Sequence, residues 1–240
     1  MNLIKLNAID STNEYIKLNK SFFSKNSLAV YSFNQTNGKG QRGKKWVSEP
    51  YKNTSISFYF RIEKPSEDLL LKTNLFTALS VLEILKSYDI PKLKIKWPND
   101  IMSGNKKIAG ILIETSIIKN KIKDIIIGIG LNINQIDFDQ MKHATSMKII
   151  KKKNFNLQDI SKRFIHKLSS LESKICNHSK EQLIEQFCTN LFGIREKQKF
   201  IIGENLVVGT ILGITDDYML NVGLGKQIEQ FENGQIKLIL

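Results

Sequence analysis

The stretch LKIKWPNDIMSGNKKIAGILIE, residues 93–114, is the one from which we interpret the rest of the chain. Apolar and polar residues alternate at its start, as in a half-buried strand, and Pro98 ends the pattern because it has no N–H to donate. An Asn-Asp pair and a polar tip follow, and a second strand is expected over residues 107–114, with Gly110 inside it. A glycine within a strand often marks the close approach of a ligand. The stretch therefore predicts one hairpin that holds a small anion, with a solvated polar hairpin as the alternative.

A strand expected over residues 121–134 has an unusual composition. Isoleucine and leucine occupy one face, whereas Gly128, Gly130, Asn132 and Asn134 occupy the other. Because a face of glycine and asparagine cannot pack a hydrophobic core, we expect a ligand to lie along this strand, with Asn132 as a hydrogen-bond partner.

The segment GKGQRGKKW, residues 38–46, contains a literal G-x-G-x-x-G. The dinucleotide-binding interpretation requires a helix directly after it, but a strand is expected over residues 53–61, and no G-K-[ST] completes a Walker motif. A glycine-rich loop with four cations is suited to bind a phosphate or a carboxylate through charge-assisted hydrogen bonds. A solvated basic loop is the competing interpretation.

The composition is that of a globular protein. The 240 residues are 41% hydrophobic and 25% charged, with a net charge of +13 and two cysteines. No apolar run is long enough to span a bilayer, and residues 1–10 lack the features of a signal peptide, so we expect a cytoplasmic protein with no membrane partner. The positive charge favours anionic partners but does not identify them.

The remaining patterns predict an α+β body over residues 1–195 and a small β-barrel over residues 196–240. Ser11 and Glu14 have the spacing of a capping box, and Ser66 is expected to cap the longest helix. Strands are expected at 3–9, 28–33, 199–202, 206–214, 219–222, 227–232 and 236–240, and helices at 12–20, 66–87, 156–176 and 179–191.

Several motifs together resemble those of the biotin protein ligases. They are, in chain order, Asp10-Ser11-Thr12-Asn13, Gln35 with the 38–46 loop, Lys96-Trp97-Pro98-Asn99-Asp100, Lys107-Ile108-Ala109-Gly110-Ile111-Leu112 and Gly128-Ile129-Gly130-Leu131-Asn132. The resemblance implies a mixed-sheet catalytic domain of the biotin/lipoate ligase type with helices packed on it, and an SH3-like barrel at the C-terminal end. The helix-turn-helix domain of repressor-type members has no counterpart in this sequence, so no binding to nucleic acid is expected.

The resemblance also implies a two-step reaction. Biotin and ATP, with Mg²⁺, would form biotinyl-5′-AMP and pyrophosphate, and a lysine of a biotin carboxyl carrier protein or domain would then take the biotinyl group. The nucleophiles belong to the substrates, and catalysis would consist of orientation and charge stabilisation. The resemblance is compatible with a homodimer.

Residue roles follow from the same resemblance. Lys107, Lys39 and Arg42 are implied as catalytic, with Lys107 holding the carboxylate against the α-phosphate. Biotin-binding residues would be Ser11, Thr12, Asn13, Gln35, Lys39, Gly40, Gln41, Lys107, Gly110 and Gly128. Residues that bind ATP or the adenylate would be Gly38, Lys39, Gly40, Gln41, Arg42, Trp46, Lys96, Asn99, Asp100 and Asn132. No protein ligand is assigned to Mg²⁺, which would arrive on the ATP phosphates.

The loop departs from the usual family pattern G-R-G-R-x-G-R-x-W. Lys39 and Lys44 keep the charge of arginine without its bidentate geometry, and Gln41 is uncharged. Two alternatives remain. One is a lipoate–protein ligase of the same fold, although no R-R-x-S-G-G-G-A stretch is present; the other is a basic nucleic-acid-binding protein, although no aromatic platform is apparent.

Overall fold

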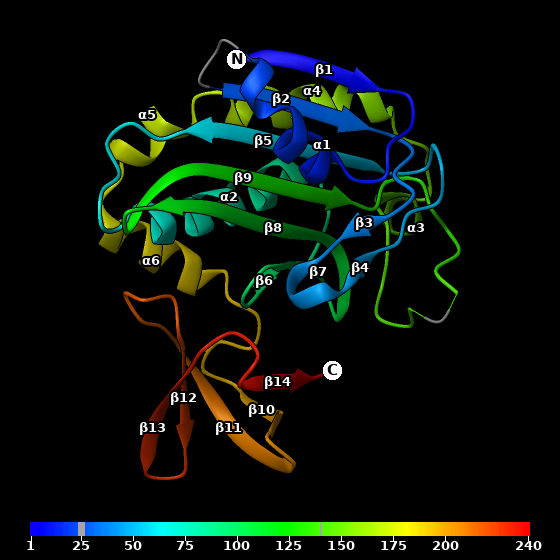
Figure 1. The fold of residues 1–240 in the computed structure, drawn as a ribbon. Helices are drawn as coiled ribbons and strands as arrows, with labels where there is room; N and C mark the ends of the chain where they lie inside the picture. Colours follow the sequence, from blue (N-terminus) through cyan, green and yellow to red (C-terminus); the bar gives the residue numbers. More distant parts are fainter. Residues whose placement is uncertain (24–26, 140) are drawn as a thin grey trace.

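A seven-stranded mixed sheet forms the centre of the protein (Figure 1). The computed structural model describes residues 1–23, 27–139 and 141–240. In spatial order the strands are β1 (Asn2–Leu6), β2 (Ser27–Ser32), β5 (Thr54–Arg61), β9 (Lys121–Leu131), β8 (Lys106–Ile118), β7 (Asp100–Ser103) and β6 (Leu93–Lys96). Only β1 and β2 pair in parallel, and the other neighbours are antiparallel. The expected mixed sheet with helices packed on it is confirmed.

Helices cover the two faces of this sheet unequally. The long helix α2 (Leu69–Lys86) contacts β6, β7 and β8, and α4 (Leu157–Leu168) contacts α2 and β5. The shorter helices α5 (Leu171–Cys176) and α6 (Lys180–Thr189) pack against α2. Helix α1 (Thr12–Asn19) lies alone on the opposite face, over β5 and β9 (Figure 1). The large core therefore lies on the α2 side.

The protein has two hydrophobic cores, one on each face of the sheet, and the alternation of side chains along the strands explains them. In β5, Ile56 and Phe58 enter the large core, whereas Tyr59 joins Ile16 of α1 and Ile126 of β9 in the small one. Because successive side chains of a strand point to opposite faces, the glycines of β9 must lie on the same face as α1. Of the helices in the described ranges, none covers the part of that face where these glycines lie.

The C-terminal residues form a five-stranded antiparallel sheet, in the order β13 (Gln227–Phe231), β12 (Leu220–Leu224), β11 (Asn205–Ile214), β10 (Lys197–Ile202) and β14 (Ile236–Ile239). Its strand order leaves β13 and β14 at the edges, so we describe it as an open sheet of the SH3-like type. Phe200 and Val222 join the same buried cluster as α2. The division of the chain after residue 195 stays a prediction.

The 93–114 stretch contains three strands, so the prediction of one hairpin was wrong. The first turn, at Trp97-Pro98-Asn99, connects β6 to β7, and the second connects β7 to β8 at Gly104. Strand β7 was missed because its four residues run from the predicted Asn-Asp turn to the first residue of the predicted polar tip, and no strand was expected between these two features. Pro98 starts the first turn as expected, and the Trp97–Pro98 peptide bond is cis.

Helix boundaries also differ from the sequence patterns. Helix α2 begins after Asp68, because the Ser66 hydroxyl donates to the Asp68 carboxylate instead of capping helical N–H groups. The helix expected over residues 156–176 is broken at Ser169-Ser170, where the Ser169 hydroxyl donates to the carbonyl of His166. Such local bonds compete with helical ones.

Short elements were missed altogether. A five-residue helix, α3 (Met147–Lys151), is capped by Ser146, and a 3₁₀ turn extends α1 over Lys20–Phe22. The 38–46 loop folds into a small hairpin of β3 (Gly38–Lys39) and β4 (Lys45–Trp46), with a 3₁₀ turn at Gln41–Gly43. We call residues 38–46 the basic loop.

Candidate functional site

A cavity of about 470 Å³ lies between the helix-free part of the sheet, the start of α1, the basic loop and the C-terminal sheet. It brings together most of the residues that the sequence nominated. Those that line it are Ser11, Thr12, Asn13, Gln35, Lys39, Gly40, Gln41, Arg42, Trp46, Lys96, Asn99, Asp100, Lys107, Gly110 and Gly128. Gly38 and Asn132 are the two nominated residues that do not line it.

The floor of the cavity is made of small residues in register on three strands. Ser55 of β5 pairs with Gly130 of β9, which pairs with Gly110 of β8, and Gly128 lies two residue pairs further along, on the same face. The absence of side chains lets other groups approach the backbone closely. A Cβ atom at Gly130 would lie 2.2 Å from Cε2 of Trp46, and one at Gly128 would lie 2.5 Å from Oδ1 of Asn13. The glycine floor therefore accommodates side chains of the loop and of α1.

Trp46, at the end of the basic loop, packs against the glycine floor. Its ring lies against Gly110 and Gly130, and the Lys107 ammonium is 5.4 Å from its centroid. The indole N–H is buried and has no hydrogen-bond partner among the residues that the structure describes. A buried donor of this kind is costly unless a ligand accepts from it.

Hydrogen bonds hold the residues at the start of α1 in place. Gln35 Oε1 accepts from the backbone N–H and the hydroxyl of Thr12, at 3.0 and 3.2 Å. The Ser57 hydroxyl lies 2.6 Å from Thr12 Oγ1 and 2.5 Å from Asn13 Oδ1. Ser11 caps the helix, at 3.5 Å from the N–H of Glu14. We call Ser11, Thr12, Asn13 and Gln35 the polar corner; together they form a preorganised, buried polar surface.

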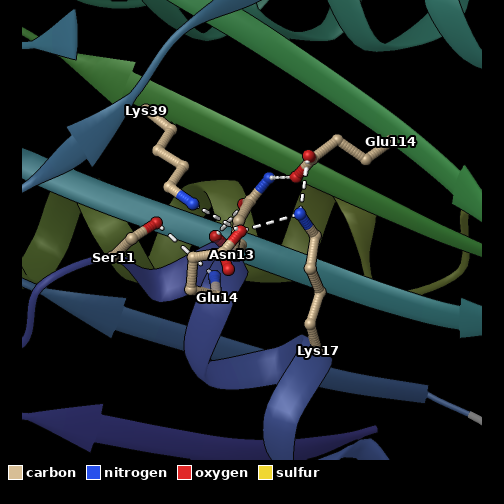
Figure 2. A network of polar contacts seen from close by, with 7 residues as sticks. Ser11, Asn13, Glu14, Lys17, Lys39 and Glu114 are labelled. Atoms are coloured by element: carbon tan, nitrogen blue, oxygen red, sulfur yellow. Dashed lines mark hydrogen bonds and ion pairs between the residues drawn. The ribbon is translucent and has the colours of Figure 1, made fainter. Parts of the chain in front are cut away.

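Ion pairs connect this corner to the basic loop (Figure 2). Asn13 Nδ2 donates to Glu114 of β8 at 2.8 Å, and Lys17 bridges Glu114 and Glu14 at 2.7 Å each. Lys39 reaches from β3 to Glu14 at 3.2 Å, in place of the capping-box bond expected of Glu14. The hydrogen bond from Lys17 lowers the pKa of Glu14; partial burial opposes this shift and Lys39 adds to it. Glu14 thus stays anionic at neutral pH and keeps attracting Lys39, and this contribution is lost only as pH falls through the lowered pKa.

Cations gather at the opposite end of the cavity. Lys107 Nζ lies 2.5 Å from Asp100 Oδ1. Lys44, Lys96 and Lys237 line the same cavity. We call Lys44, Lys96, Lys107 and Lys237 the lysine cluster. With Asp100 as their neighbouring carboxylate they leave an excess of positive charge, which is suited to bind a polyphosphate.

The comparison with known families agrees with this geometry. Residues 6–132, more than half of the chain, match the biotin/lipoate A/B protein ligase family. The chain belongs to this family. The matched region carries α1, the basic loop and the glycine floor.

Individual relatives show the extent of the similarity. The bifunctional ligase/repressor BirA of Escherichia coli K12 is 34% identical over 129 residues, which are 53% of this chain and 39% of that protein. The biotin–[acetyl-CoA-carboxylase] ligase of Paracoccus denitrificans is 34% identical over 129 residues, 52% of this chain and 51% of its own length. The chain therefore spans about half or less of the length of these relatives.

A solved structure matches nearly the whole chain. The biotin protein ligase from Aquifex aeolicus in complex with biotin and ATP has a TM-score of 0.80 and 27% sequence identity, and the match covers 99% of this chain and 98% of that chain. The fold of the family therefore extends over the C-terminal sheet as well as over the matched residues 6–132.

The two nominated residues outside the cavity wall have internal partners. Asn132 is buried, and its amide donates to the carbonyl of Thr145 at 3.0 Å. Gly38 is wedged between Gln35 and Trp46, where a Cβ atom would lie 2.4 Å from Nε2 of Gln35. Their contact with an adenylate stays a prediction, and in this structure both residues support their neighbours.

Some cavity residues were missed by the sequence analysis. Ser55, Lys237 and Asn233 line it, the last two from the C-terminal sheet. The alternation of small polar residues with isoleucine and phenylalanine along β5 was a usable signal for Ser55. No local signal placed Lys237 or Asn233 at the site, because only tertiary packing brings the C-terminal sheet to this cavity.

Lys96 yields a stability prediction. Burial lowers its pKa; Asp100 opposes this shift, while Lys107, Lys44 and Lys237 add to it. The unfolded chain therefore binds the Lys96 proton more readily than the folded chain does. At neutral pH the charged Lys96 lowers the free energy of unfolding. This cost disappears as pH rises from the lowered pKa toward the ordinary value of 10.5. We expect Lys96→Met to raise Tm at pH 7 by about 2 °C or more.

Differential scanning calorimetry between pH 7 and 10 checks the expected effect of Lys96→Met on Tm. The Tm difference between Lys96→Met and the wild type should shrink as pH rises, whereas Lys226→Met, at an exposed turn, should change Tm little at any pH. A Tm of Lys96→Met below that of the wild type at pH 7 would contradict the prediction.

Among the helices of the described part of the chain, none is long and apolar enough to cross a membrane. The same residues contain no cluster of three His, Cys, Asp or Glu side chains suited to hold a metal ion.

Proposed function

We propose that this protein joins biotin to a lysine of a biotin carboxyl carrier protein or domain, through biotinyl-5′-AMP formed from biotin and ATP. The main observation in support of the proposal is that the polar corner, the lysine cluster and the glycine floor line one cavity. The similarity to biotin ligases from two bacteria and to a solved biotin protein ligase supports it.

The polar corner suits the ureido head of biotin. A ureido group carries two N–H donors and one carbonyl acceptor, and Ser11, Thr12 and Gln35 offer hydroxyl and amide partners from a buried, hydrogen-bonded setting. A site built to hydrogen-bond polar groups discriminates strongly against an analogue that lacks them. Lipoate has no ureido group, so this corner favours biotin over the lipoate alternative.

The lysine cluster suits the first chemical step. A carboxylate oxygen of biotin attacks the α-phosphorus of ATP, and the bond from that phosphorus to the bridging oxygen breaks, so that pyrophosphate leaves. Lys107 would draw the carboxylate and the α-phosphate together and stabilise the added negative charge. Lys96 and the basic-loop cations Lys39 and Arg42 would bind the phosphates. Bringing the two anions together is the main barrier that these cations offset.

The remaining roles concern the adenylate and its acceptor. Trp46, whose indole N–H has no partner in the described part of the chain, would contact the adenylate. Asn99 and Asp100 would shape the nucleotide side, to which Mg²⁺ would come bound to the ATP phosphates. In the second step the ε-amine of the acceptor lysine attacks the acyl carbon, the bond to the AMP oxygen breaks, and the amine loses a proton. A cytoplasmic location and a homodimer stay predictions.

Mass spectrometry tests the proposal directly. The protein is incubated with ATP, Mg²⁺ and either biotin or lipoate, and the products are searched for the acyl-adenylate. We expect biotinyl-AMP with biotin and no adenylate with lipoate. Adenylate with lipoate alone would favour a lipoate–protein ligase, and adenylate with neither acid would refute both adenylation proposals.

A further inference from the structure

The tip of the basic loop touches the C-terminal sheet, at the turn between β13 and β14. The Arg42 guanidinium donates to the backbone carbonyl of Asn233 at 2.5 Å. The Asn233 side-chain amide donates to Oε1 of Gln41 at 2.7 Å. Residues almost two hundred positions apart in the sequence are thus joined by two hydrogen bonds at the mouth of the cavity.

The backbone on both sides fits this contact. Gly234 has a φ of +95°, and a Cβ atom there would lie 2.1 Å from Nη1 of Arg42. Arg42 itself has left-handed angles, φ 53° and ψ 44°. A left-handed conformation is unusual for a residue other than glycine, and here it forms part of the 3₁₀ turn whose side chains reach Asn233. Any side chain at position 234 would displace the guanidinium.

The opposite end of the loop is anchored to the body of the protein. Lys39 pairs with Glu14 of α1, and Trp46 packs on the glycine floor. The loop therefore bridges the cavity between α1 and the C-terminal turn. Its four cations lie within nine residues of the sequence, so such contacts help to offset their mutual repulsion.

We propose that the Asn233–Gly234 turn is the docking site that holds the tip of the basic loop over the cavity, and that Asn233 is a positioning residue for Gln41 and Arg42. The family loop usually carries arginine where this chain has Gln41, and arginine has no acceptor to offer Asn233. With Gln41 in place of arginine, this chain has one positive charge fewer near the phosphates and one neutral hydrogen bond to the C-terminal sheet. The part of the proposal that concerns adenylate retention rests on the proposed function; the docking itself does not.

Limited trypsin digestion of the full chain without substrates tests the docking. Cleavage between Arg42 and Gly43 is followed by mass spectrometry in the wild type, Asn233→Ala, Gln41→Ala and the double variant. Loss of one hydrogen bond should accelerate this cleavage by about fivefold, and the double variant should be no faster than either single variant. Asn205→Ala, at an exposed position on the same sheet, is the matched control and should behave as the wild type.

A second measurement reports on function. Once biotinyl-AMP formation has been observed, its release from Asn233→Ala should be about fivefold faster than from the wild type, while Tm changes by less than about 2 °C. A merely structural role would instead lower Tm without a selective change in the release rate.

Three results would overturn the docking proposal. The first is an Arg42–Gly43 cleavage rate in Asn233→Ala within twofold of the wild type. The second is an equal acceleration in Asn205→Ala, and the third is a double variant whose acceleration is the product of the two single ones. Because digestion needs no substrate, a failure to form biotinyl-AMP would refute the proposed function and leave these outcomes unchanged.

Discussion

The rate of biotinyl-AMP formation is expected to fall by about 10³-fold when Lys107 is replaced by alanine, because a preorganised charge aimed at the reacting phosphate is lost. Lys107 is the member of the lysine cluster that lies against Gly110 of the glycine floor, beside Asp100 and Trp46. Without it, Asp100 would repel both the carboxylate and the phosphates. Single-turnover formation of the adenylate with excess ATP and biotin measures the effect.

The fold should survive this substitution. The backbone of Lys107 is held by bonds to His143 and Thr145, which do not involve the side chain, and a half-exposed ion pair contributes little to stability. Tm should therefore stay within a few degrees of the wild type. Lys106→Ala, at the exposed neighbouring position, is the control and should form adenylate normally. Wild-type rates in Lys107→Ala would exclude the proposed role.

The affinity for biotin should drop by about 100-fold in Gly128→Ala, because Asn13 is displaced and the buried hydrogen bonds that position it are lost. The new methyl group would lie 2.5 Å from Oδ1 and 3.0 Å from Cγ of Asn13. Asn13 would have to leave the Ser57 hydroxyl and the Glu114 carboxylate, and the start of α1 would move with it. Titration calorimetry with biotin measures the affinity.

Gly223→Ala is the matched control for this variant. Gly223 also lies in a strand, and the nearest atom to a Cβ there is Leu212 Cδ1 at 3.4 Å, an ordinary van der Waals contact. Its affinity for biotin should equal that of the wild type. If Gly128→Ala bound biotin as tightly as Gly223→Ala, Asn13 would have no role in shaping the biotin pocket.

Most of the residues nominated from local motifs line the cavity. The alternation of isoleucine and glycine in β9 indicated an open face, and this face is the glycine floor. The capping residue Ser11 marked the start of α1 correctly, since a cap depends only on a few neighbouring residues. In contrast, the strand β7 was missed, because four residues carry too little periodic pattern to be recognised.

The occupants of the open face could not be predicted. The sequence analysis assigned the space beside Gly128 and Gly130 to a ligand, whereas Asn13 and Trp46 fill part of it in the structure. Which side chain lies on a given glycine depends on where α1 and the basic loop pack. No spacing within β9 contains that information.

By itself, the sequence determined the family, the order of its motifs, the glycine face of β9 and the run of short C-terminal strands, because each is read from a local pattern of residues. The tertiary structure alone decided that Lys237 and Asn233 reach the cavity and that Gln41 has a partner 192 residues away. The physical reason is that hydrogen bonds and charge pairs act over a few ångströms in space, and the packing of the C-terminal sheet against the main sheet sets those distances.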